Sequence, residues 1–131
     1  MRQYSFTIKK RGLAGYYVTV TPSFRAFDSD NTLKFIQLAQ RKWEKIIEFI
    51  ENTGIVPHGG GSATCALCVA YGIRKGCYQC PIAKHTGQIY CKDTPYDSWC
   101  RGTNPASKLA AARAELTFLK KLEREISGEN T

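Results

Sequence analysis

The chain has 131 residues, 43% of them hydrophobic, and 19 lysines and arginines against 11 acidic residues give a formal net charge of +8. This length predicts a single domain with a real core. No apolar run is long enough to cross a membrane, and no continuous apolar stretch follows the N-terminus, so we expect no membrane partner and no signal peptide, in a protein kept inside a cell. The positive charge suits a polyanion such as nucleic acid, although solubility alone would also explain it.

The N-terminal segment alternates apolar and polar residues, with Tyr4, Phe6 and Ile8 on one side. A period of two predicts a half-buried strand. The glycines of KRGLAG then supply a turn, and YYVTVT alternates again until Pro22. We therefore predict an antiparallel hairpin whose loop is longer than two residues.

Residues 28–52 have the pattern of a long amphipathic helix, and Gly54 stands where a C′ residue would end it. Lys34, Arg41 and Lys45 form a basic stripe towards its start, whereas the helix dipole favours cations at its end. A solvated surface explains this stripe, but Arg41 and Lys45 are also candidate nucleic-acid contacts. The predicted apolar face contains Ile36, Ala39, Trp43, Ile46 or Ile47, and Ile50.

Five of the six cysteines lie in the stretch CALCVAYGIRKGCYQCPIAKHTGQIYC, where two Cys-x-x-Cys pairs are separated by eight residues. Such pairs each act as one knuckle of a tetrahedral zinc site, with Zn–S distances of about 2.3 Å. We predict that Cys65, Cys68, Cys77 and Cys80 bind one zinc ion per chain, with Cys91 as the first substitute.

The charges around these cysteines agree with a metal site. Residues 54–92 contain no Asp or Glu but include Arg74, Lys75, Lys84 and Lys92. Cations without carboxylates stabilise a zinc centre with four thiolates, whose formal charge is about −2, and these four side chains are further candidate contacts to nucleic acid. Because no local carboxylate can act as a general base, we predict no catalytic residues and no enzyme.

The cysteines have alternative interpretations. An iron–sulfur cluster also takes four cysteines, but the spacing matches neither ferredoxin pattern. A thioredoxin-like redox site needs a preceding strand, which neither pair has. Six cysteines also permit three disulfides without any metal, and Cys91 could then pair with Cys100. Either histidine, His58 or His85, could replace a cysteine as a ligand, although we expect surface or loop roles for both.

The segment KDTPYDSWCRGTNP has no clear period, which predicts an ordered loop. Asn104 and Pro105 then form a strong helix start. We expect this C-terminal helix to pack on the first helix or to pair with a copy of itself in a homodimer, and residues 128–131 to fray. Its apolar side contains Leu109, Ala112, Leu116, Leu119, Leu122 and Ile126.

Several tyrosines lie among lysines and arginines and could stack nucleic-acid bases. Packing with a solvated hydroxyl is the favoured role for tyrosines in strands and around metal sites, and Trp43 is expected in the core. The tyrosines concerned are Tyr16, Tyr17, Tyr78, Tyr90 and Tyr96.

The stretch from Cys65 to Tyr96 resembles a pattern in small uncharacterised proteins of phages and archaeal viruses: C-x-L-C, C-x-x-C-P-[IV], T-G, Cys and T-P-Y. The whole chain looks like an open-reading-frame product of a spherical virus of hyperthermophilic archaea. The resemblance implies a viral accessory protein in the host cytoplasm or associated with the virion, with no assigned activity. It leaves Cys100 outside the site, and hot archaeal hosts would favour the disulfide alternative.

We therefore predict a single α+β domain in three parts: residues 1–53 form a hairpin and a helix, residues 54–104 a cysteine-bound metal region, and residues 105–131 a C-terminal helix. The predicted function is that of a small basic viral protein with a structural zinc site, which binds nucleic acid or acts as a regulatory interaction module. The alternative is a disulfide-stapled structural or virion-associated protein without metal.

Overall fold

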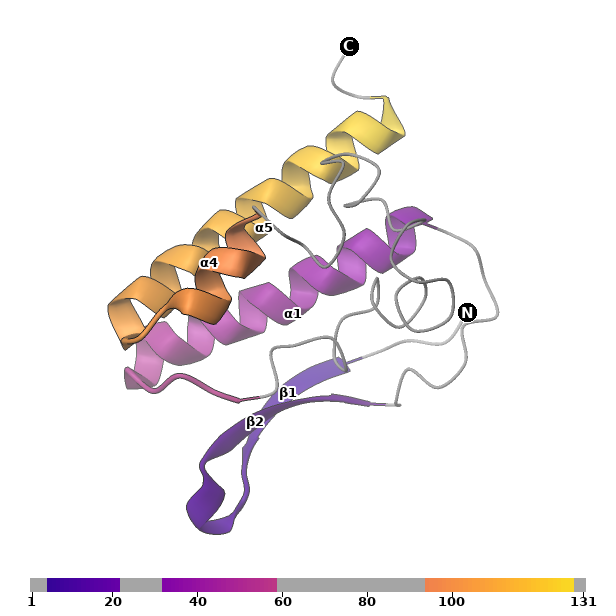
Figure 1. Ribbon diagram of the computed structural model, residues 1–131. Coiled ribbons are helices and arrows are strands. Elements are labelled where there is room, and N and C mark those ends of the chain that lie inside the picture. Colours follow the sequence, from indigo (N-terminus) through magenta and orange to yellow (C-terminus); the bar gives the residue numbers. More distant parts are fainter. Residues whose placement is uncertain (1–4, 22–31, 59–93, 129–131) are drawn as a thin grey trace.

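The computed structural model describes residues 5–21, 32–58 and 94–128. Figure 1 shows the long helix α1 between two other layers, with the hairpin on one side and helices α4 and α5 on the other. The predicted α+β class, the hairpin and the long helices at these places are confirmed. The described elements are β1 (Ser5–Lys10), a 3₁₀ turn η1 (Gly12–Ala14), β2 (Tyr16–Thr21), α1 (Thr32–Thr53), α4 (Pro95–Arg101) and α5 (Pro105–Ser127).

The hairpin has the predicted two faces. Strands β1 and β2 pair antiparallel, with Phe6 opposite Val20 and Ile8 opposite Val18. Because directly opposed residues share a face of the sheet, these four apolar side chains lie together against the core. The sequence alternation therefore predicted which side of the ribbon is buried.

The chain returns to the hairpin after α1. Gly54, just past the last residue of α1, has a φ of +70° and donates its N–H to the Ile50 carbonyl at 2.8 Å, as expected of a C′ glycine. His58 then forms a single parallel bridge to β2: its N–H donates to the Tyr16 carbonyl at 2.7 Å, and the Val18 N–H donates to the His58 carbonyl at 2.8 Å. The free edge of β2 is thus paired for one residue.

The core lies mainly between the two long helices, which run in opposite directions (Figure 1). Ile36, Trp43 and Ile46 of α1 are buried with Leu119 and Leu122 of α5. The C-terminal helix therefore packs on α1, which is one of its two predicted uses, and a homodimer through the same helix stays a prediction. Helix periodicity placed these residues correctly because each helix is long enough to repeat its apolar face several times.

The start of α5 is the one predicted from sequence. Asn104 is the N-cap and Pro105 occupies the first turn. The Ser107 N–H donates to the Asn104 side chain at 2.8 Å, and the Ser107 side chain in turn lies 3.3 Å from the Asn104 N–H, which completes a capping box. Gly128 ends the helix with a φ of +81°.

Helix α4 corrects the sequence prediction, which treated residues 92–105 as a loop. Thr94 and Pro95 start a helix of seven residues, and Gly102 ends it. Asp97 and Arg101 form an ion pair across one turn at 3.0 Å. Only Trp99 is buried within it, so a helix this short shows no repeated apolar position for periodicity to detect.

Glu123 links the two long helices through hydrogen bonds. It accepts from the Gln37 amide at 2.9 Å and from the Gln40 amide at 2.8 Å. These bonds, that from Gln37 first, hold the pKa of the Glu123 carboxyl below its ordinary value, although partial burial acts in the opposite direction. Since the folded-state pKa is lowered, the stabilisation is present above the unfolded-state pKa and is lost as the pH falls through the folded-state pKa.

We therefore expect Glu123→Gln to lower the free energy of unfolding by roughly 1 kcal/mol at neutral pH. The loss of stability relative to the wild type should shrink as the pH falls through the folded-state pKa of Glu123, because the wild-type carboxyl then takes up a proton. Urea unfolding at about pH 7 and about pH 3 measures the difference. Glu44→Gln, on the exposed side of α1, is the control, and its difference from the wild type in free energy of unfolding should not depend on pH. An equal loss of stability for Glu123→Gln at both pH values would contradict the prediction.

Candidate nucleic-acid interface

The hairpin turns one polar face away from the core, and we call it the outer face. Lys9 is opposite Tyr17, and Thr7 is opposite Thr19, with their hydroxyl oxygens 2.8 Å apart. Cross-strand pairs share a face, so these four side chains lie together on the side opposite the buried residues. The outer face consists of Thr7, Lys9, Arg11, Tyr17, Thr19 and His58.

Two planar side chains contact the Tyr17 ring on this face. The Arg11 guanidinium carbon lies 5.3 Å from the ring centroid. The His58 ring lies at 5.1 Å with an interplanar angle of 36°, held there by the backbone bridge between His58 and β2. Aromatic rings and guanidinium planes are the surfaces on which nucleic-acid bases stack. The outer face thus joins stacking groups to hydroxyls that can donate or accept hydrogen bonds.

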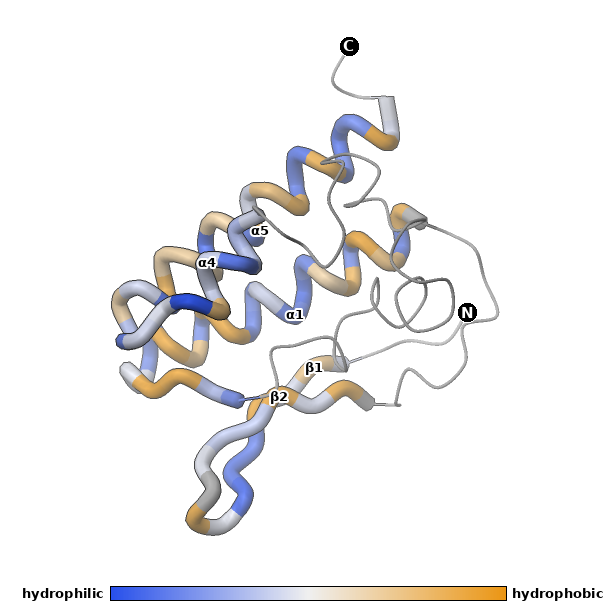
Figure 2. The backbone as a smooth tube through the Cα atoms, in the orientation of Figure 1, coloured by the Kyte–Doolittle hydropathy of each residue, from blue (hydrophilic) through white to orange (hydrophobic). Residues whose placement is uncertain are grey.

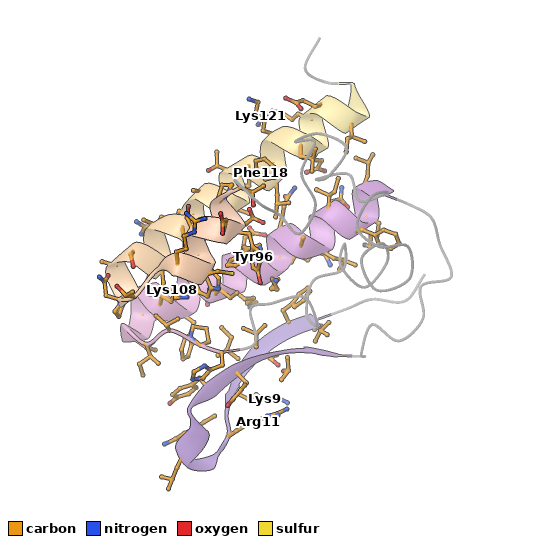
Figure 3. All side chains as sticks on the ribbon, viewed as in Figure 1. Lys9, Arg11, Tyr96, Lys108, Phe118 and Lys121 are labelled. Carbon is orange, nitrogen blue, oxygen red and sulfur yellow. The ribbon has the colours of Figure 1, made fainter. Side chains whose placement is uncertain are left out.

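The charge of the hairpin is entirely positive. Lys9, Lys10 and Arg11 are consecutive and exposed, and Figure 3 shows Lys9 and Arg11 close together on the hairpin, away from the helices. Residues 5–21 contain no Asp or Glu. Within the part of the chain that the structure describes, none of the three cations forms an ion pair. Their positive potential is therefore not cancelled by a neighbouring carboxylate.

The turn at the end of the hairpin is closed by two glycines. Gly12 has a φ of +52° and Gly15 a φ of +100°, values that side chains with a Cβ rarely adopt. The Arg11 N–H donates to the Gly15 carbonyl at 2.8 Å. Leu13, between the glycines, is fully exposed. In Figure 2 a hydrophilic stretch runs down the hairpin to an apolar segment at the turn.

The other described tyrosines have packing roles. Tyr16 is on the inner face, where its ring lies 5.0 Å from that of Phe49. Tyr96 of α4 packs with its ring 6.2 Å from that of Trp43. Among the described tyrosines, Tyr17 alone has its ring on the outer face. Of the five stacking candidates, Tyr78 and Tyr90 lie outside the described residues.

Two cations that contribute to the net charge lie against tryptophan rings of the core instead. Lys42 is 1% exposed, and its ammonium lies 4.8 Å from the Trp43 ring. The Lys108 ammonium lies 4.8 Å from the Trp99 ring and donates to the Trp99 carbonyl at 2.6 Å. A buried or internally bonded ammonium is not available to a polyanion. The net charge therefore overstates the cationic surface, because the position of each cation decides whether it is available to a polyanion.

The predicted basic stripe on α1 is mixed in charge. Arg41 and Lys45 are exposed one turn apart, but Glu44 and Glu48 are exposed beside them. Carboxylates three or four residues from a cation on a helix reduce its field. The other predicted contacts, Arg74, Lys75, Lys84 and Lys92, fall outside the described residues.

The predicted metal ligands are not among the described residues. Cys65, Cys68, Cys77, Cys80 and Cys91 fall outside the described ranges, and so does His85. The sixth cysteine, Cys100, is an exposed free thiol on α4. In residues 5–21, 32–58 and 94–128, no three His, Cys, Asp or Glu side chains are grouped to hold a metal ion. No helix in these ranges is long and apolar enough to cross a membrane.

None of the known protein-family models, curated proteins or solved structures matches this chain. The described fold and outer face define an α+β protein with a projecting, cationic, aromatic β-ribbon. Sequence reasoning did not single out Lys9, Lys10, Arg11 or Leu13, although one signal was present. Residues 1–27 contain five basic residues and no Asp or Glu, a composition that would have pointed to this end of the chain.

Proposed function

We propose that this protein binds nucleic acid through the outer face of its hairpin and the three consecutive cations beside it. The observation that carries the proposal is the run of exposed cations Lys9, Lys10 and Arg11 on a segment without carboxylates. Lys9 and Arg11 lie beside Tyr17 on the outer face, whereas Lys10, opposite Tyr16, lies on the other side of the ribbon. The resemblance of the cysteine segment to viral proteins supports a role as a viral accessory module, and the spacing of its two Cys-x-x-Cys pairs supports a structural zinc ion.

The chemistry of the outer face suits both the phosphate backbone and the bases of a nucleic acid. Lysine and arginine neutralise phosphates and release counterions, which supplies most of the affinity that does not depend on sequence. A two-stranded β-ribbon also fits the major groove of duplex DNA, which is about 12 Å wide. The hydroxyls of Thr7 and Thr19 and the Tyr17 ring would then meet phosphates, sugars or bases.

Solubility alone would explain scattered surface cations. Elsewhere on the described surface, however, several cations have an acidic neighbour: Arg101 pairs with Asp97, and Arg113 pairs with Glu51. The hairpin concentrates three cations without any such compensation. This contrast favours a polyanionic partner at the hairpin over a general solubilising charge.

The test is a triple variant, Lys9→Gln with Lys10→Gln and Arg11→Gln, which removes the charges but keeps polar side chains. We expect its affinity for duplex DNA to fall on the order of tenfold or more at low salt, and the slope of log K against log salt concentration to become shallower by about 2 to 3, as each lost phosphate contact removes about 0.9. Fluorescence anisotropy across a salt series measures both quantities.

A matched control removes the same charge from α5: Lys120→Gln with Lys121→Gln and Arg124→Gln, all exposed positions. Figure 3 shows Lys121 towards the opposite end of the molecule from Lys9 and Arg11. The control should keep most of the affinity and slope. An equal loss in both variants would mean that net charge alone attracts the DNA, and no binding by the wild type at low salt would remove the proposal.

A further inference from the structure

Leu13 is exposed to an unusual degree for a large apolar side chain. It is 107% exposed, whereas the other exposed large hydrophobics of the described ranges, Ile55 and Ile126, are 43% and 42% exposed. Burying a leucine side chain stabilises a folded protein, and Leu13 contributes no such burial in this fold. Folding therefore does not explain a leucine at this position, whereas a contact made outside the chain would.

The turn holds Leu13 at the apex of the arm. The positive φ angles of Gly12 and Gly15 and the hydrogen bond from Arg11 to Gly15 close the loop around it. Leu13 follows Arg11 by two residues and Lys9 by four, so the chain between these cations and the tip spans at most about 7–13 Å at about 3.3 Å per residue. The grooves of B-DNA are only about 7.5–8.5 Å deep. An arm whose cations lie at a phosphate backbone is therefore long enough for its tip to reach the base pairs.

We infer that Leu13 is a wedge that inserts between adjacent base pairs of duplex DNA and kinks it. The inference rests on the proposed function, because Lys9, Lys10 and Arg11 would bring the tip to the duplex. Apolar side chains that enter a base step unstack it, and the cost of unstacking is offset by the buried apolar surface and by contacts that the bent DNA makes with the protein. The partner of Leu13 is thus a step between two adjacent base pairs of duplex DNA.

An anionic membrane would also attract a basic arm with an apolar tip. A single leucine, however, buries much less apolar surface than a myristoyl chain, and even one myristoyl chain binds membranes only marginally. The outer face beside the tip carries paired hydroxyls and the stacked rings of Tyr17 and His58, which suit bases and sugars better than lipid. These two observations favour duplex DNA.

The experiment uses a duplex of about 30 base pairs with a donor and an acceptor fluorophore at its ends. We expect wild-type protein to raise the energy-transfer efficiency on binding. Leu13→Ala should lose most of this rise, while its affinity falls by less than about tenfold and its salt slope is unchanged, because the phosphate contacts remain. The variant should fold normally, since the side chain is fully exposed.

Ile126→Ala is the matched control, because it truncates another exposed apolar side chain on α5, far from the hairpin (Figure 1). It should bend the duplex as the wild type does. Binding without bending by the wild type, or full bending by Leu13→Ala, would overturn the wedge but leave the proposed function intact. No binding at low salt would remove both. Binding to phosphatidylserine vesicles that depends on Leu13, with no bending of DNA, would also overturn the wedge and assign the tip to membranes.

Discussion

Replacing Trp43 with alanine is expected to lower the free energy of unfolding by about 3–5 kcal/mol. Trp43 is 1% exposed on α1. Its ring meets the Trp99 ring of α4 edge-on at 5.1 Å and the Tyr96 ring at 6.2 Å, with the Lys42 ammonium 4.8 Å away. Alanine would leave a cavity among groups from two helices and would remove the aromatic surface near a buried ammonium.

Urea unfolding followed by far-ultraviolet circular dichroism measures this effect without relying on the deleted fluorophore. Trp43→Phe is the matched variant: it keeps an aromatic ring against Trp99, so it should lose roughly half as much stability or less. Leu13→Ala, which removes a fully exposed side chain, should not change stability. A loss below about 1 kcal/mol for Trp43→Ala would show that the surroundings collapse into the space and that the cluster contributes little.

The same substitution should act most strongly on α4. A helix of seven residues is too short to be stable by itself in water, so its helical state depends on packing. Trp99, its buried residue, meets Trp43 directly. In Trp43→Ala, amides of residues 96–101 should therefore exchange with solvent hydrogen faster than those of α5. Uniform acceleration in both helices would instead indicate global unfolding.

The parts of the fold that sequence predicted are those with several repeats of one pattern. The hairpin alternates over six paired positions, and α1 and α5 repeat their apolar spacing over many turns. Their apolar faces could therefore be assigned without any knowledge of a partner. Helix α4 has one buried residue and is held by Trp43 of another helix, a contact that no local pattern encodes.

The candidate interface shows the same limit. Lys9 and Lys42 are the same residue type in similar basic surroundings, yet Lys9 is exposed and Lys42 is buried against Trp43. The position of His58 beside Tyr17 depends on the chain returning to β2 after α1. Composition indicated that a polyanion would suit this protein, but only the arrangement of elements assigns the cations that can meet one. The cysteine site lies outside the described residues and stays a prediction from spacing.

Zinc removal is the other change from which we expect a large effect. Protein purified without added metal should contain one zinc ion per chain by elemental analysis. The double variant Cys65→Ser with Cys68→Ser should lose the metal and several kcal/mol of stability, because zinc binding of about 10–16 kcal/mol in small zinc-finger peptides is also folding free energy. Cys100→Ser is the matched control, since Cys100 is an exposed free thiol outside the predicted ligand set.

The disulfide alternative gives the opposite set of results. It predicts no metal and no reactive thiols before reduction, and an intact mass that rises by two hydrogen atoms for each bond reduced. Cys100→Ser then becomes informative, because it would change the number of bonds if Cys91 pairs with Cys100. A zinc content that survives the double variant would contradict the predicted ligands even if the protein binds metal.

The described core limits how much of the protein should unfold when zinc is removed. The five clustered cysteines follow His58, which is bonded to β2, and precede Thr94, the N-cap residue of α4. The segment that holds them is thus joined at both ends to described elements, and within the described ranges α1 packs on α5 and β1. We therefore expect chelation to lower the thermal midpoint while most of the helical circular dichroism remains at about 25 °C, in contrast to zinc fingers, which unfold without metal. Complete loss of that signal would mean that the core depends on the metal.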